Sequence, residues 1–283
     1  MIKRFNYYKP SLASSWVLVA WLLVGSLALG LALALLSTLT GWAFWKTTTF
    51  SYVCTMIVPL AFAFFVAGRE RRDGATAVPL NKPDFGKTSG FVFFVVLFFG
   101  LVALSVLIEP LSAAIPMGDR MRALFEQVFE DSPLWDAVAA TCILAPILEE
   151  FLCRGLMMRG MMYNGMKPWK AILWSAFIFA FIHLNPWQAI PAFAFGCFFG
   201  WVYWKSGCLW ATVFMHFVNN SLSTLLTRLF PDLEVDSGWV DILPKTQYIV
   251  LYAACLVVFA AVVFFISRNY DKKTVSAEVP SDC

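Results

Sequence analysis

The sequence predicts an all-α, polytopic membrane protein with about eight transmembrane helices and one interfacial amphipathic helix. Of its 283 residues, 60% are hydrophobic and only 14% are charged, whereas a soluble domain has about 25% charged residues. Apolar runs long enough to cross a bilayer, about 17 to 25 residues each, recur along the chain. Because no repeat or flexible linker separates them, we expect one membrane domain over residues 1–283.

Eight apolar runs stand between polar breaks, and each is an expected helix. In order, they are Ser15–Leu36, Phe50–Ala67, Gly90–Leu111, Leu134–Met158, Trp169–Leu184, Trp187–Trp204, Cys208–Leu229 and Gln247–Ser267. The first run exceeds the roughly 7 to 15 apolar residues of a signal peptide, so we expect an uncleaved span. The fifth is the shortest, and Asn185 followed by Pro186 is typical of a turn before the sixth.

Between the third and fourth runs, five apolar residues recur at the spacing of an amphipathic helix: Met121, Leu124, Phe125, Val128 and Phe129. We expect this helix to lie flat on the outer membrane surface. Ser132 and Pro133 are typical of the N-cap and first turn of the fourth span. Residues 268–283 are polar, and we expect a disordered tail.

The basic residues predict the orientation of the chain. With eight spans, both chain termini lie on the same side of the membrane. Most of the 21 Lys and Arg residues fall on that side. Five fall on the opposite side (Lys46, Arg120, Arg122, Arg228 and Lys245), and Arg154 lies within a span. Because cytoplasmic loops are enriched in Lys and Arg, we expect both termini in the cytoplasm. The expected location is a bacterial plasma membrane. Nothing in the sequence suggests nucleic-acid binding, and the seven cysteines lack the spacing of a metal site.

The fourth expected span contains three charged side chains, Glu149, Glu150 and Arg154. A charged residue near the centre of a spanning helix costs about 2.5 to 3.5 kcal/mol, so these side chains need partners or a hydrated cavity. Glu150 and Arg154 share a helix face and can form an ion pair, whereas Glu149 points about 100° away and is free for another task. Pro146 cannot donate to the carbonyl of Cys142, so we expect the helix to kink or open before the glutamates.

Both histidines of the chain also lie within apolar runs, His183 in the fifth and His216 in the seventh. Asn220 follows His216 by one turn and shares its face. A single intramembrane His or Asn, or a single Glu–Arg pair, is often only a contact between helices. Six such side chains between residues 149 and 220 favour one buried site. We interpret Phe179, one turn before His183, as packing that holds the imidazole.

These residue types predict hydrolysis. A buried carboxylate beside imidazoles and an amide can take a proton from water and stabilise an oxyanion. Cys153 has no histidine at hydrogen-bond spacing, so no nucleophile with a base emerges. There is also no H-E-x-x-H zinc helix. Glu149, His183 and His216 could supply three zinc ligands, and a metal-free glutamate mechanism fits equally well.

Three motifs follow one another on successive apolar runs: E-E-x-x-x-R (Glu149, Glu150, Arg154), F-x-x-x-H (Phe179, His183) and H-x-x-x-N (His216, Asn220). In this order they resemble the CPBP family, the CAAX prenyl protease and bacteriocin-processing proteins, also called type II CAAX endopeptidases or the Abi family. The resemblance covers about residues 134–229, the expected catalytic core. It implies an eight-helix intramembrane endopeptidase with a cavity open toward the cytosol. The implied substrate is a membrane-associated or prenylated peptide.

The resemblance also implies a role for each residue. Glu149 would activate the attacking water with help from His183. His216 and Asn220 would stabilise the oxyanion, while Glu150 and Arg154 would organise the site. Two alternatives remain: a non-proteolytic scaffold or bacteriocin-immunity protein of the same fold, and a proton-coupled transporter. The transporter predicts repeat-related broken helices, which the sequence lacks.

Overall fold

The structure is a computed structural model that describes residues 2–41, 48–115, 117–119, 122–123, 133–230 and 237–270. Within these residues, all regular secondary structure is helical and no strand occurs. The expected interfacial helix around Met121–Phe129 and the N-cap at Ser132 lie essentially outside the described residues, as does the tail from residue 271.

Each of the eight expected runs contains helix. The elements are a 3-10 helix Ile2–Tyr7, α1 Leu12–Thr40, α2 Thr48–Arg72, α3 Gly90–Ala113, α5 Leu134–Ala137, α6 Ala145–Glu150, α7 Arg159–Tyr163, α8 Pro168–Phe181, α9 Pro186–Ser206, α10 Leu209–Leu229, α11 Trp239–Ile242 and α12 Lys245–Asn269. Four of them (α1, α2, α3 and α12) are long and apolar enough to cross a membrane, and α8 is a shorter apolar helix. These helices indicate an integral multi-pass membrane protein.

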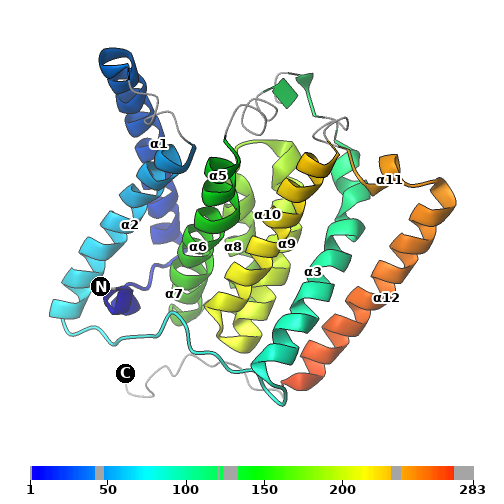
Figure 1. Cartoon of the computed structure of the whole chain (residues 1–283). Helices are drawn as coiled ribbons and strands as arrows, with labels where there is room; N and C mark the ends of the chain where they lie inside the picture. Colours follow the sequence, from blue (N-terminus) through cyan, green and yellow to red (C-terminus); the bar gives the residue numbers. More distant parts are fainter. Residues whose placement is uncertain are drawn as a thin grey trace.

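The helices form three groups, which Figure 1 shows side by side. α1 packs against α2, and α3 packs against α12. Between these pairs lies a central group in which α8 packs against α9 and α10 contacts α6, α9 and α3. Small residues allow the outer pairs to approach closely: a Cβ on Gly25 would lie 2.8 Å from Val58, and one on Gly100 would lie 2.7 Å from Val262.

The segment Leu134–Tyr163 is one helical run whose geometry changes along its length. α5 is followed by a π-helix, Val138–Leu144, then by α6, a second π-helix at Phe151–Met158, and α7. The expected opening next to Pro146 is therefore confirmed, since the first π-helix ends just before it. The second π-helix was not anticipated. Glu149 and Glu150 thus lie on a short α-helical piece between two widened turns, a feature common at functional sites.

Local signals in the sequence explain how α9 begins and ends. The side chain of Asn185 accepts a hydrogen bond from the backbone N–H of Gln188 at 2.8 Å, and Pro186 occupies the first turn. The helix ends at Gly207, whose φ of 59° is unfavourable for other residues. A Cβ there would also lie 2.4 Å from the carbonyl oxygen of Lys82. This glycine is therefore required by both the turn and the close approach of another segment.

Candidate active site

A fully buried ion pair lies at the centre of the polar set. Arg154 Nη1 donates to Glu150 Oε1 at 2.7 Å, and both side chains have no exposed surface. Arg154 Nη2 donates to the carbonyl of Gly196 on α9 at 2.9 Å. The guanidinium also lies over the ring of Phe179, 4.7 Å from its centroid. The expected i, i+4 pair is confirmed, and the arginine additionally joins the fourth span to α9.

Gly196 allows this contact because it has no side chain. A Cβ at this position would lie 3.0 Å from Ala176 and 3.1 Å from Arg154 Nη2. Larger residues would push the guanidinium away from the carbonyl that it binds. Gly196 is therefore a packing residue, and its carbonyl accepts a hydrogen bond from the buried arginine.

The imidazole of His216 on α10 lies between the two glutamates. Its Nδ1 lies 3.1 Å from Glu150 Oε1 and donates to it, since a carboxylate only accepts. Its Nε2 lies 3.9 Å from Glu149 Oε2. The ring packs edge-on against Phe179 and is only 5% exposed. One histidine thus contacts both carboxylates, so Glu149 is not isolated from the ion pair as its position on the helix had suggested.

Glu149 has a second partner, which the sequence patterns did not indicate. The hydroxyl of Tyr52 on α2 donates to Glu149 Oε1 at 2.8 Å. A tyrosine near the end of an apolar helix is usually an interface residue, so its type and position did not distinguish it. The only available signal was its place one turn after the polar Thr48–Thr49 pair.

Asp136 on α5 places this tyrosine. Its carboxylate accepts from the backbone N–H groups of Thr48 at 2.7 Å and Thr49 at 2.9 Å, so it caps the first turn of α2. The side chain is 1% exposed. Because Tyr52 lies one turn further along α2, this cap holds the start of α2 against the helix that carries the glutamates.

His183 lies at the end of α8 and has a different environment. Its Nδ1 lies 2.7 Å from the carbonyl of Phe179 and donates to it, so Nε2 carries the lone pair of the neutral ring. The ring of Phe179 packs edge-on against both imidazoles, at 5.1 Å from His183 and 5.5 Å from His216. This agrees with the interpretation of Phe179 as packing. In the described part of the chain, no hydrogen bond or ion pair joins His183 to either glutamate.

Asn220 connects α10 to the first π-helix. Its Nδ2 donates to the carbonyl of Thr141 at 2.8 Å, and its Oδ1 accepts from Asn219 at 3.2 Å. Thr141 belongs to the widened turns before the glutamates. The amide is therefore held in place and retains one N–H for another acceptor.

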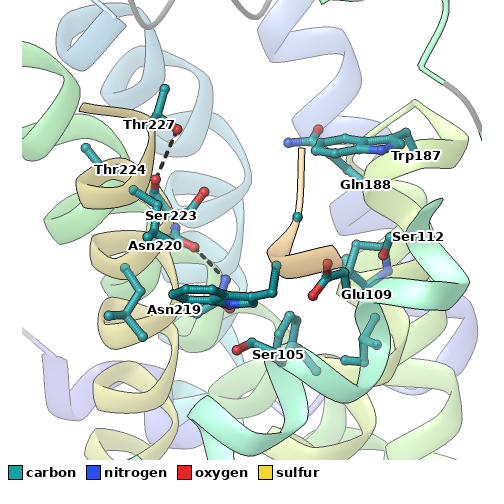
Figure 2. Close-up of a pocket in the computed structure, with 18 of the residues that line it drawn as sticks. Ser105, Glu109, Ser112, Trp187, Gln188, Asn219, Asn220, Ser223, Thr224 and Thr227 are labelled. Atoms are coloured by element: carbon teal, nitrogen blue, oxygen red, sulfur yellow. Dashed lines mark hydrogen bonds between the residues drawn. The ribbon is translucent and has the colours of Figure 1, made fainter. Parts of the chain in front are cut away.

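A cavity of about 440 Å³ with both polar and apolar lining residues adjoins these residues and is bordered by His183, His216 and Asn220. Figure 2 shows Asn220, Ser223 and Thr227 of α10 on one side, with Glu109 and Ser112 of α3 opposite. Glu149 and Glu150 do not belong to the described lining, whereas His216, which lies next to both, does. The structure thus joins Glu149, Glu150, Arg154 and His216 directly, whereas His183 and Asn220 share only the cavity with His216.

The donor set does not fit a three-ligand zinc site as it stands. Among the described residues, no group of three or more His, Cys, Asp or Glu side chains could hold a metal ion. The hydrogen bonds of the three candidates do not exclude a metal, because His183 and His216 use only Nδ1 and Glu149 accepts from Tyr52 only through Oε1.

Fold and site together define a class: an integral multi-pass helical protein with acidic, basic and imidazole side chains buried beside a cavity. Residues 131–222 match the family model described as type II CAAX prenyl endopeptidase, Rce1-like. This stretch contains all six residues of the polar set and is similar to the type II CAAX prenyl endopeptidase domain. Comparison with curated proteins and with solved structures gave no significant match.

Proposed function

We propose that the protein is an intramembrane endopeptidase that hydrolyses a peptide bond of a membrane-associated or prenylated substrate with water activated by Glu149. The observation that carries this proposal is the imidazole of His216, which lies between the two carboxylates and borders the cavity. The match of residues 131–222 to a family of endopeptidases supports it independently.

In this mechanism Glu149 is the general base. Tyr52 holds its Oε1, and its Oε2 lies 3.9 Å from His216 Nε2, a separation at which one water can contact both atoms. Glu149 takes a proton from that water as the oxygen attacks the peptide carbonyl, and later returns the proton to the leaving amine. A positioned base of this kind contributes about 10²- to 10⁴-fold to the rate.

The other polar side chains have supporting roles. The remaining N–H of Asn220 stabilises the oxyanion of the tetrahedral intermediate, and His216 adds to this when its Nε2 also carries a proton, since its Nδ1–H is used for Glu150. His183 Nε2, which carries a lone pair, helps to orient the water. Glu150 fixes His216 through its Nδ1, and Arg154 holds Glu150 in place.

The proposed architecture is one membrane domain over residues 1–283 with eight crossings and both termini cytoplasmic. α9 and α10 each have 21 residues, about 31 Å at 1.5 Å per residue, which is enough for a hydrocarbon core of about 30 Å. They are less apolar than the four long spans because they carry the cavity-lining Gln188, His216 and Asn220. α8 has 14 residues, only about 21 Å, so we expect a locally thinned membrane at its ends.

Purified protein in detergent, with a fluorogenic library of membrane peptides, tests the proposal. Wild type should cleave, whereas Glu149→Ala and His183→Ala should lose most turnover. Asp73→Ala, at an exposed carboxylate after α2, is the matched control and should cleave normally. Equal cleavage by all four proteins would remove the proposed site.

A chelator and metal add-back series should follow on the same protein. Turnover retained after chelation agrees with the glutamate mechanism. Loss on chelation, with recovery on adding zinc, would contradict it. If wild type cleaves nothing in the library, the non-proteolytic scaffold becomes the better explanation.

A further inference from the structure

The cavity lies at one end of the helix bundle. Its lining comes from the C-terminal halves of α3 and α10, the N-terminal half of α9 and the whole of α11. These parts meet at the end where α11 lies in Figure 1, away from the N-terminus. The mouth of the cavity therefore belongs to this end of the molecule.

The opposite end is closed by the chain itself. The buried guanidinium of Arg159 donates to the carbonyls of Phe5 and Tyr8, at 3.2 and 2.6 Å, and to that of Val78. The guanidinium also donates to the carbonyl of Gly155 in the second π-helix. It thereby joins this helix to the N-terminal 3-10 helix and to the connection between α2 and α3. Backbone oxygens thus surround the charge and hold three segments together.

The connection between α2 and α3 completes this closure. The carbonyl of Leu80 accepts from the hydroxyl of Tyr203 at 2.8 Å, and the side chain of Leu80 is 5% exposed within the core. Asn81 Oδ1 accepts from the backbone N–H of Leu209, so the same connection also caps the start of α10. We name residues 74–88 the strap. Strap and N-terminal helix together cover the end of the described bundle that lies away from the cavity.

The two ends also differ in charge. Basic side chains gather at the closed end: Lys3, Arg4, Lys9, Arg69, Arg71, Arg72, Lys82, Lys87, Arg159, Lys167, Lys170, Lys205 and Arg268. Three described basic residues, Arg122, Arg228 and Lys245, lie towards the other end. The described lining of the cavity contains no Lys or Arg and two carboxylates, Glu109 and Asp241. Since basic loops remain in the cytoplasm, the closed end is the cytoplasmic one.

We propose that the cavity opens on the extracytoplasmic side, so the substrate is an exported, membrane-anchored polypeptide whose cleaved bond lies in the outer half of the bilayer. This rests on the proposed function, and it names the substrate class for that site. The basic residues predict cytoplasmic loops at the closed end, whereas the family resemblance implies a cavity open toward the cytosol, and this geometry does not allow both. We base the orientation on the basic residues because they are a property of this chain. With this orientation, prenylated cytosolic peptides are excluded as substrates.

The mouth also predicts the charge of the substrate. Glu109 Oε1 accepts from the backbone N–H of Val240 at 2.8 Å, which holds α11 against α3 as part of the cavity wall. Asp241 Oδ2 accepts from the N–H of Gly238 at the start of α11. Both carboxylates are thus fixed near the entrance. They favour neutral or basic residues beside the cleaved bond and repel acidic ones.

Cysteine labelling in intact bacterial cells tests the orientation. Ser223→Cys places a thiol in the cavity, and Ala77→Cys places one on the exposed strap; neither residue belongs to the proposed catalytic set. A membrane-impermeant maleimide is applied to intact cells and to detergent-solubilised protein. For each variant, the labelling of the parent protein is subtracted, and the labelling in intact cells is divided by the labelling in detergent. The solubilised sample shows that each variant is folded and reactive.

The ratio for Ser223→Cys should exceed that for Ala77→Cys by about fivefold or more. Equal ratios, or a higher ratio for Ala77→Cys, would overturn the proposed orientation. In detergent, the substrate can reach both sides of the protein. The cleavage assay therefore tests the proteolytic function alone, whereas the labelling tests the orientation alone.

A pair of detergent-soluble peptides tests the charge preference. They differ only in having Lys or Glu beside the cleaved bond, and the Lys peptide should show a several-fold higher kcat/KM that declines at high salt. Glu109→Gln should reduce the ratio of kcat/KM for the Lys peptide to kcat/KM for the Glu peptide. A preference for the Glu peptide would refute the acidic entrance as a selective element.

Discussion

Replacing Arg154 by methionine should destabilise the protein more than any other single change at the site. Methionine retains most of the side-chain volume but leaves the carboxylate of Glu150 buried without its cation. The variant cannot form the hydrogen bonds to Glu150 and Gly196 or the cation–π contact with Phe179. Breaking one partner of a buried ion pair costs about 3 to 5 kcal/mol, and the stranded charge accounts for most of it.

The double variant Glu150→Gln/Arg154→Met separates this effect from simple loss of packing. It removes the stranded charge, so we expect it to recover about half of the lost stability. Recovery is incomplete because the carbonyl of Gly196 still lacks its donor and His216 loses a charged acceptor. Arg268→Met is the matched control, since that arginine is exposed on α12 and lies over Phe264.

Unfolding by a denaturing detergent, followed by near-UV circular dichroism, gives the free energy of unfolding for the four proteins under one set of conditions. Arg268→Met should match wild type closely, as most exposed substitutions do. If Arg154→Met were as stable as this control, or if the double variant were no more stable than the single one, the ion pair would not have the energetic role assigned to it.

Three further outcomes follow from the site. Glu149→Gln keeps the size of the side chain but removes the base, so peptide turnover should fall by about 10²- to 10⁴-fold while the unfolding midpoint stays near wild type; wild-type turnover would contradict the mechanism. Tyr52→Phe removes the donor to Glu149 and should lower kcat by about tenfold, whereas Tyr7→Phe on the N-terminal helix should leave kcat unchanged. Asp136→Ala removes the cap of α2 and should lower the free energy of unfolding by about 0.5 to 2 kcal/mol; an unchanged value would show that the cap contributes little.

The contact of one imidazole with both glutamates has a physical explanation. Neighbouring residues of an α-helix point about 100° apart, so their side chains usually meet different partners. An imidazole has two nitrogens directed away from each other, and His216 uses one for Glu150 and the other for Glu149. This arrangement links the buried ion pair to the proposed base, so a disturbance at Glu150 should also affect Glu149.

Much of the fold could be predicted from local patterns. The apolar runs predicted helices, and the structure has helix in all eight of them. The Glu150–Arg154 pair followed from i, i+4 spacing, and the opening before Glu149 followed from Pro146. These features depend on residues within one or two turns of each other, which a sequence displays directly.

The site could be predicted only as a set of candidates. Their number and burial indicated one polar site, but spacing along the chain does not say which side chain meets which. The structure joins His216 to both glutamates and leaves His183 beside the cavity. Tyr52 lies 97 residues from Glu149 and outside the matched stretch, so no local pattern could connect them.

The sequence by itself determined that the chain is helical and membrane-embedded and that a few polar side chains must be buried, because hydropathy and helical periodicity are local properties. Only the tertiary structure decided which of these side chains touch, that α2 contributes a donor, and at which end the cavity lies. These depend on how separate helices pack, and packing is set by contacts between residues far apart in the chain.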